Sequence, residues 1–210
     1  VNDVSFELFP YDHCGSFFVN NDSIILIPSQ GIPLQVNGKV PAGLPLRTDV
    51  DGQPDMIEVG RLSMRVIRRG GRLFLRVWDR EAEIMKTFPG LRYYPINPAF
   101  CLETLYVPYE TPKIISITDA IGTIQESRFP GEAQFALNGV ECRLMAQEDE
   151  DGLLFNFTDL TREDSTYPGG RYLETPVPVG QRLVLDFNLA VNWPCAYTSF
   201  ATCPFPPPEN

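Results

Sequence analysis

The chain has 210 residues, of which 43% are hydrophobic and 21% are charged, a composition typical of a globular protein with one large β domain or two small ones. It holds no run of apolar residues long enough for a membrane-spanning helix, which needs about eighteen. The net charge of −10 argues against general nucleic-acid binding.

Turn signals recur along the whole chain at intervals of about eight to twelve residues, which is typical of an all-β sandwich or barrel. The run SIILIP at 23–28 predicts a short buried strand. The pair Asn37-Gly38 predicts a tight hairpin turn, because both residues tolerate a positive φ. Residues 1–86 are therefore expected to form a small β sandwich. Through SIILIP, VNGK and VGRLSM this part resembles forkhead-associated domains in fold, although it lacks the set of residues with which those domains bind phosphothreonine.

The clearest hairpin of this first domain is RLSMRVIRRGGRLFLRVWD at 61–79, which turns at Gly70-Gly71. Its apolar residues alternate, so Arg65 and Arg76 are expected to point outward. Seven of the chain's arginines fall within 61–80 beside one acid, Asp79, which gives this window a charge of +6 and the rest of the chain −16. Such a strip can bind a carboxylate or phosphate, or it can pair with the protein's own acidic surface. The alternating apolar residues are Leu62, Met64 and Val66 on one arm and Leu73, Leu75 and Val77 on the other.

The stretch TFPGLRYYPINPAF at 87–100 interrupts this rhythm with three prolines and a Pro-Gly turn, which predicts a connector between domains. Its aromatic residues (Phe88, Tyr93, Tyr94 and Phe100) favour a packed connector over a flexible one. A C-terminal domain at 101–210 follows, predicted as an antiparallel β sandwich or barrel closed by a proline-rich strap. Its expected strands lie at 102–109, 112–118, 121–127, 132–147, 153–161 and 181–192, with a hairpin turn at Asn138-Gly139 and a solvated acidic turn at 148–152.

The cysteines and the histidine limit the possible chemistry. Five cysteines are an odd number in a chain too long to need disulfides, so a reducing, cytoplasmic location is expected. Cys195 and Cys203 lie eight residues apart, unlike the short spacing of structural zinc sites. The single histidine, His13, excludes a His-based metal cluster and disfavours a Ser–His–Asp or Cys–His enzyme. We therefore predict neither a metal nor a cofactor.

Two stretches near the C-terminus depart from the pattern of strands and turns. In STYPGGRYLETP (165–176), the two glycines permit close approach of a ligand or of another backbone segment, and Arg171 follows directly. The run LDFN at 185–188 predicts Asp186 and Asn188 on one polar strand face at the rim of a pocket.

The last twenty residues, VNWPCAYTSFATCPFPPPEN, hold five prolines, each of which removes a backbone donor. We expect a fixed strap here, held by its own side chains. Trp193, Tyr197 and Phe200 would anchor it to the β core, and Asn192, Thr198, Thr202 and Asn210 would satisfy its backbone.

These stretches closely resemble the C-terminal signature of a bacterial and archaeal family of proteins of unknown function, DUF1684. The resemblance extends upstream through RLSMRVIRRGGRLFLRVWD, FPGLRYYPINPAF and YVPYETPK, and so covers roughly residues 60–210. It implies no activity, substrate or cofactor. The signature falls on Tyr167, Pro168, Gly170, Arg171, Asp186, Asn188, Asn192, Pro194, Cys195, Ala196, Tyr197, Thr202, Cys203, Pro204, Glu209 and Asn210.

Two functions remain open. In the first, the turn 167–171, the strand 183–192 and the strap 192–210 form a pocket, and the protein binds a small anionic ligand or is a carboxylate-based enzyme. Binding is preferred over cysteine catalysis, because the base for the thiol would have to be a carboxylate. The catalytic candidates are Asp186, Glu209, Cys195 and Cys203, and the ligand-binding candidates are Tyr167, Arg171, Asn188, Asn192, Tyr197 and Thr202. In the second, a non-enzymatic module uses the Arg-rich hairpin 61–80 to dock an acidic protein or a second copy, as a homodimer. Neither function involves nucleic acid or a membrane.

Overall fold

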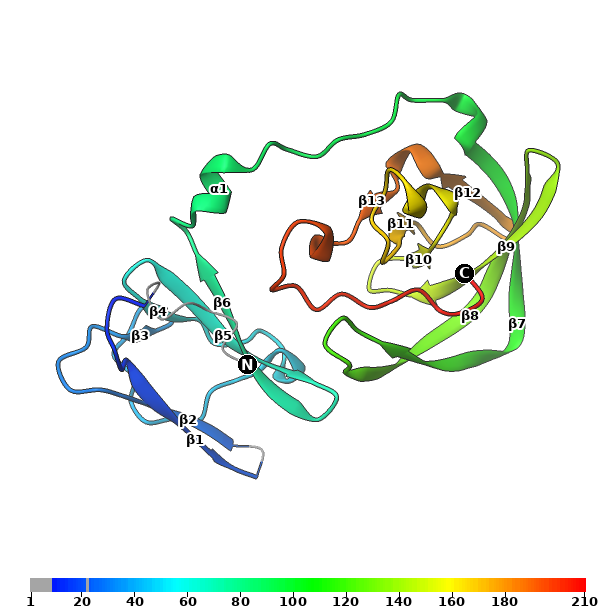
Figure 1. Ribbon diagram of the computed structural model, residues 1–210. Coiled ribbons are helices and arrows are strands. Elements are labelled where there is room, and N and C mark those ends of the chain that lie inside the picture. The colour runs from blue at the N-terminus through cyan, green and yellow to red at the C-terminus, as the bar shows by residue number, and fades with distance from the viewer. Residues whose placement is uncertain (1–8, 22) are drawn as a thin grey trace. The chain divides into compact units, whose positions relative to one another are not determined.

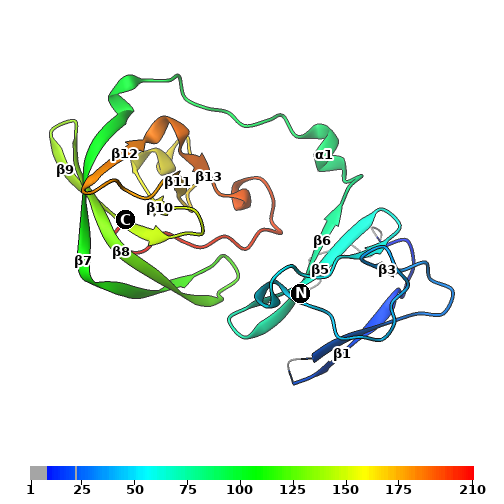
Figure 2. The same cartoon turned by 180° about the vertical axis from the view of Figure 1, so that it is seen from behind.

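The computed structural model describes residues 9–21 and 23–210 (Figures 1 and 2). The chain divides into two compact units, one ending at Leu91 and the other running from Arg92 to Asn210. All strand pairs in both units are antiparallel, which confirms the predicted all-β class. Within the described ranges, no helix is both long enough and apolar enough to cross a membrane.

The described part of the N-terminal unit forms two sheets around one core. Ile24 and Leu26 of one sheet are buried together with Ile57, Leu62 and Met64 of the other, each with at most 3% of its surface exposed. This arrangement is the small sandwich that the sequence predicted, and its likeness to forkhead-associated domains stays a prediction. One sheet pairs β1 (Gly15–Asn20) with β2 (Ser23–Pro28), and the other has the order β3 (Gln35–Val36), β4 (Ile57–Val59), β5 (Leu62–Arg69) and β6 (Arg72–Asp79). A 3₁₀ helix, Asp49–Asp51, lies between β3 and β4.

The hairpin of β5 and β6 has the predicted register. Met64 lies opposite Val77 and Arg65 lies opposite Arg76, so the apolar and the charged side chains occupy opposite faces. Gly70 and Gly71 have φ values of 52° and 72°, the left-handed conformation that a two-residue hairpin turn of this type needs at both positions.

The connector is less packed than predicted. It contains a short helix, α1 (Glu83–Thr87), and a 3₁₀ helix, Pro98–Phe100, and every residue from 83 to 100 is exposed. Tyr93 and Tyr94 keep 59% and 52% of their surface exposed, so these two rings are not buried as a packed connector would require. The segment is instead held at one end, where the Asn97 backbone N–H donates to Asn188 Oδ1 at 2.9 Å.

The C-terminal unit, described from end to end, is one curved sheet of seven strands in the order β12-β7-β8-β9-β10-β11-β13. Its edge strands do not hydrogen-bond to each other, so the fold is sandwich-like and is not a closed barrel. Phe155, Leu173 and Leu185, from three different strands, meet in its core. The strands are β7 (Cys101–Thr118), β8 (Ile124–Leu137), β9 (Val140–Glu148), β10 (Leu153–Phe157), β11 (Arg171–Thr175), β12 (Arg182–Asp186) and β13 (Val191–Asn192).

Strand β7 joins two stretches that were predicted as separate strands. Its pairing with β8 shifts register between Pro108 and Lys113, and this irregularity accommodates Pro108 and Pro112 within one strand. The predicted turn from β8 to β9 is confirmed at Asn138 and Gly139, which have φ values of 52° and 78°.

Candidate functional site

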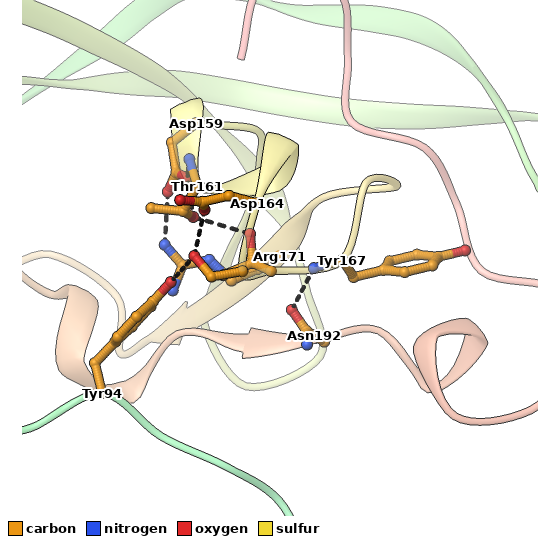
Figure 3. Close-up of polar contacts among 9 residues, drawn as sticks. Tyr94, Asp159, Thr161, Asp164, Tyr167, Arg171 and Asn192 are labelled. Atoms are coloured by element: carbon orange, nitrogen blue, oxygen red, sulfur yellow. Dashed lines mark hydrogen bonds and ion pairs between the residues drawn. The ribbon is translucent and has the colours of Figure 1, made fainter.

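A polar cluster lies directly after β10, between that strand and β11 (Figure 3). The Asp159 side chain caps the 3₁₀ helix Leu160–Glu163 by accepting from the Thr161 backbone N–H at 2.9 Å, and it also accepts from the Thr161 hydroxyl. Thr161 Oγ1 lies 2.8 Å from Thr166 Oγ1. The sequence TDLTREDST thus folds back on itself through its short polar side chains.

Arg171, the first residue of β11, points into this cluster. Its Nη2 donates to Asp159 Oδ2 at 2.6 Å, and its guanidinium carbon lies 5.5 Å from the centre of the Phe157 ring. Burial on its own would raise the pKa of the Asp159 carboxyl, but the hydrogen bonds from Thr161 and Arg171 and the charge of Arg171 lower that pKa below its ordinary value. The Asp159 carboxyl is therefore ionised at neutral pH.

The same cluster also contains hydroxyl groups and a second carboxylate (Figure 3). The Tyr94 hydroxyl lies 2.5 Å from Ser165 Oγ, and Ser165 Oγ donates to Asp164 Oδ1. Tyr94, Asp164 and Ser165 are exposed, whereas the Arg171 side chain has 13% of its surface exposed. The cluster therefore combines a nearly buried cation, Arg171, with an exposed polar rim made of Tyr94, Asp164 and Ser165.

The two glycines before Arg171 leave space for neighbouring groups of the same chain. Gly170 has a φ of 97°, and a Cβ at this position would lie 2.7 Å from both the Phe157 carbonyl oxygen and Cγ of Pro206. The close approach predicted at this turn is therefore made by β10 and by the C-terminal strap, because only glycine leaves space for the Pro206 ring.

Side-chain hydrogen bonds hold the strap, whose course Figures 1 and 2 show, at several points. Phe200, which was predicted to anchor it, is instead 65% exposed. Trp193 Nε1 donates to Asn156 Oδ1 at 2.9 Å, and Asn156 Nδ2 donates to the Pro204 carbonyl at 3.1 Å. At the C-terminus, Asn210 Oδ1 accepts from Met145 N–H at 2.8 Å, and its Nδ2 donates to the carbonyls of Met145 and Asn156 at 3.1 and 3.0 Å. Side chains thus replace the hydrogen bonds that the prolines cannot make, as the sequence indicated.

Cys195 and Cys203 are joined by a disulfide that closes a loop within the strap. Neither sulfur is a free thiol in this state, so the nucleophilic role predicted for these two residues is incompatible with the structure as it stands. The odd number of cysteines gave no indication of this disulfide, because Cys14, Cys101 and Cys142 are not in disulfides.

Asp186 and Asn188 do not share a strand face as predicted. Strand β12 ends at Asp186, and a 3₁₀ helix, Phe187–Leu189, follows. Asp186 Oδ1 caps this helix and accepts from Asn188 Nδ2 at 2.7 Å, while Asn188 Nδ2 also donates to the Asn97 carbonyl at 3.0 Å. Since Asn188 lies in the 3₁₀ helix, its side chain no longer follows the alternation of the strand. Asp186 and Asn188 instead hold the connector in place. The predicted pocket wall 183–192 is therefore three short elements, with β13 as the third.

Of the other predicted residues, three contact one another and two do not. Asn192 links Tyr167 and Tyr197, because its Oδ1 accepts from the Tyr167 N–H at 3.3 Å and its Nδ2 donates to the Tyr197 hydroxyl at 3.4 Å. Thr202 is half-buried beside the disulfide, and Glu209 is exposed and acts electrostatically on Tyr109. The structure brings Tyr167, Asn192 and Tyr197 together and leaves Glu209 with other neighbours.

A hollow of about 540 Å³ lies elsewhere in the C-terminal unit. It is lined by Tyr106, Leu153 and Val177 and by the acidic turn 148–151, which was predicted as a solvated hairpin tip. None of the predicted site residues lines it. Over the described ranges, no group of three His, Cys, Asp or Glu side chains is arranged to hold a metal ion.

The C-terminal unit matches a known family. A family model described as "Protein of unknown function (DUF1684)" matches residues 86–210, more than half of the chain. The chain belongs to this family. The DUF1684 match confirms the resemblance stated for the strap, but it begins after the Arg-rich hairpin, which that resemblance had included.

A solved structure is also similar to this DUF1684 chain. It is the solution NMR structure of an uncharacterized protein of Haloarcula marismortui, with 28% sequence identity and a TM-score of 0.50, and the alignment covers 60% of this chain and 72% of that one. No curated protein matches the chain. The comparisons thus give a family and a structural relative without a function.

Sequence reasoning missed the roles of four residues that organise this region. Asn156 has 3% of its surface exposed, and its signal was an amide inside the apolar run LLFNF. Asp159 and Thr161 stand in the spacing of a helix cap, D-x-T, just after a strand. Tyr94 was expected only to pack as part of the connector, and its contact with Ser165 was not predicted because it joins residues 71 positions apart.

Proposed function

We propose that this protein binds a small anionic ligand and that Arg171 holds the anion. The observation that supports this proposal is the number of donors Arg171 leaves unused. Its nearly buried guanidinium makes one hydrogen bond to the described residues, to Asp159, out of the five that its N–H groups can donate. None of its nitrogens is both fully buried and unpartnered, so the other donors reach the surface. A guanidinium of this kind binds a carboxylate or a phosphate through two parallel hydrogen bonds.

The rim of the site favours an anion that also carries hydroxyl groups. Ser165 and Tyr94 offer hydroxyls that can donate or accept, and Asp164 offers a carboxylate that accepts. A small hydroxylated carboxylate or phosphate ester would place its charge on Arg171 and its hydroxyls on this rim. Binding is preferred over catalysis, because the disulfide removes the two predicted thiols and Asp186 is engaged with Asn188.

A ligand screen by thermal shift tests this function. Small carboxylates, hydroxy acids and sugar phosphates are compared on the wild type and on Arg171→Gln. A ligand that binds only the native state raises the melting temperature of the wild type. We expect at least one such ligand, and we expect its effect to be lost in Arg171→Gln.

The matched control is Arg182→Gln, which removes an equal charge from an exposed pair in the same unit, where Arg182 and Glu103 have side chains 80% and 74% exposed. It should keep the ligand effect. An effect that survives in Arg171→Gln, or a complete absence of hits, contradicts the proposal.

Three further predictions stay open. A homodimer and the docking of an acidic protein by hairpin 61–80 are tested by light scattering and by the salt dependence of any complex. The cytoplasmic location rests on cysteine composition, and the Cys195–Cys203 disulfide counts against it. Thiol labelling of the protein in cell fractions tests it, since a cytoplasmic protein would be found with the two thiols reduced.

A further inference from the structure

The N-terminal unit carries a second cationic surface, independent of Arg171 and outside the region matched by the DUF1684 family. Residues directly opposite each other in an antiparallel pair project from the same face. Arg65 lies opposite Arg76, and Arg69 lies opposite Arg72. We name these four arginines the arginine face.

Among the described residues, the arginine face has too few carboxylates to balance its charge. Asp49 forms an ion pair with Arg69. For Arg65, Arg72 and Arg76, the described residues supply no carboxylate within ion-pair distance. Within the described part of the unit, four guanidinium groups thus share one acidic partner, and directly opposed like charges are unfavourable.

Aromatic and apolar side chains hold these arginines in place. The guanidinium carbon of Arg65 lies 5.1 Å from the centre of the Trp78 ring, and that of Arg72 lies 5.1 Å from the centre of the Phe74 ring. Ile67, between Arg65 and Arg69 on the strand, is 4% exposed. Arg65 and Arg72 are therefore positioned over aromatic rings before any ligand arrives, which lowers the entropy cost of binding.

Two observations indicate that the guanidinium groups lack a partner. Arg65 Nε is buried without a hydrogen-bond acceptor in the described structure. Burial lowers the pKa of Arg76, and the charges of Arg65 and Arg69 lower it further, against a smaller opposite effect of Asp49. A buried donor without an acceptor and a cation destabilised by other cations both point to an anion that this surface accommodates.

We infer that the arginine face binds a tetrahedral oxyanion, a phosphate or sulfate group, between Arg65 and Arg76. Two opposed guanidinium groups can each direct N–H donors at one central anion, and Arg69 and Arg72 flank it. A doubly charged tetrahedral anion offers oxygens to both groups at once and offsets more of the excess charge than a single carboxylate does. It therefore pairs with more of the donors and positive charge of the arginine face.

The two tryptophans of the chain give a local readout of this binding. Trp78 lies under Arg65 in the N-terminal unit, and Trp193 lies in the strap of the C-terminal unit. Inorganic phosphate and sulfate are titrated into ¹⁵N-labelled protein at constant ionic strength, with acetate as the comparison. The indole N–H signal of Trp78 should shift and saturate with phosphate and sulfate, with at least tenfold weaker binding of acetate, while the signal of Trp193 should not follow the same curve.

Variants separate the arginine face from general charge. Arg65→Gln and Arg76→Gln should each weaken phosphate binding at least tenfold. Arg80→Gln removes the same charge from the same hairpin, but Arg80 is already paired with Glu58, so it should change binding less than twofold. Equal losses in all three variants, or saturation by acetate at the same concentration, would overturn the inference.

A second readout distinguishes binding from a structural role. Because the Arg76 charge is unfavourable in the folded state, Arg76→Gln should not lower the melting temperature of the ligand-free protein. A clear drop would mean that Arg76 braces the fold, and it would count against the inference.

A phosphoserine peptide and inorganic phosphate, run in parallel, distinguish the source of the oxyanion. Tighter binding of the peptide at the same arginines identifies a phosphorylated protein, and equal binding identifies a free anion. Failure of both overturns the inference, whatever the outcome at Arg171.

Discussion

The strap region of the C-terminal unit and the arginine face of the N-terminal unit both concentrate polar side chains on apolar strands, but they balance them differently. In the strap region, the amide groups of Asn156 and Asn210 donate to backbone carbonyls, and Arg171 pairs with a carboxylate. On the arginine face, Arg65 and Arg76 lie beside each other and lack such a partner among the described residues. Paired polar groups stabilise a fold, whereas like charges held together cost stability and indicate a place for a ligand.

The largest expected effect is that of Asn156→Ala, which sharpens the first half of this comparison. The substitution removes the partner of the Trp193 indole N–H and of the Pro204 carbonyl in a part-buried site. We expect it to lower the free energy of unfolding of the C-terminal unit by about 3 kcal/mol, measured by urea denaturation. Gln125→Ala, on an exposed position of β8, should cost less than about 0.5 kcal/mol. Equal costs would mean that the strap is held without Asn156.

The disulfide should have the next largest effect. Replacing both Cys195 and Cys203 by serine opens a loop of eight residues and should lower the free energy of unfolding by roughly 2 to 3 kcal/mol. The exposed free cysteine provides the control as Cys101→Ser. If a reductant leaves the stability of the wild type unchanged, the disulfide does not contribute.

A smaller effect on stability is expected when acid protonates Asp159 and so breaks its ion pair with Arg171. The folded-state pKa of Asp159 is lowered, so its contribution is fully present above the unfolded pKa of about 3.9 and is lost as the pH falls through the folded value. Comparison of the wild type with Asp159→Asn should give a difference of about 1 kcal/mol at pH 7, because the carboxylate is partly exposed. The difference should shrink as the pH falls below about 4. A difference that does not depend on pH would rule out the ion pair as its origin.

Much of the fold could be predicted from local patterns. The alternation in 61–79 and the pairs Asn37-Gly38 and Asn138-Gly139 depend on side-chain period and on a positive φ, which neighbouring residues determine. The strap was predictable as well, because five prolines in twenty residues need side-chain partners.

The composition of the site could not be predicted in the same way. The polar alternation Asp186–Asn188 was interrupted by a 3₁₀ helix that the Asp186 cap stabilises, and Tyr94 reaches Ser165 only through the fold. The outward direction of Arg65 and Arg76 followed from the sequence. That no described carboxylate pairs with them did not follow from the sequence, because it depends on where the acidic side chains of the folded unit lie.

The most direct measurement of the central comparison is the stability of Arg76→Gln beside that of Arg171→Gln in the ligand-free protein. Urea unfolding can be followed through the indole N–H signals of Trp78 and Trp193, one in each unit. We predict that Arg171→Gln lowers the stability reported by Trp193 by about 1 kcal/mol, whereas Arg76→Gln leaves the stability reported by Trp78 unchanged or raises it. Equal destabilisation by the two substitutions would contradict the account.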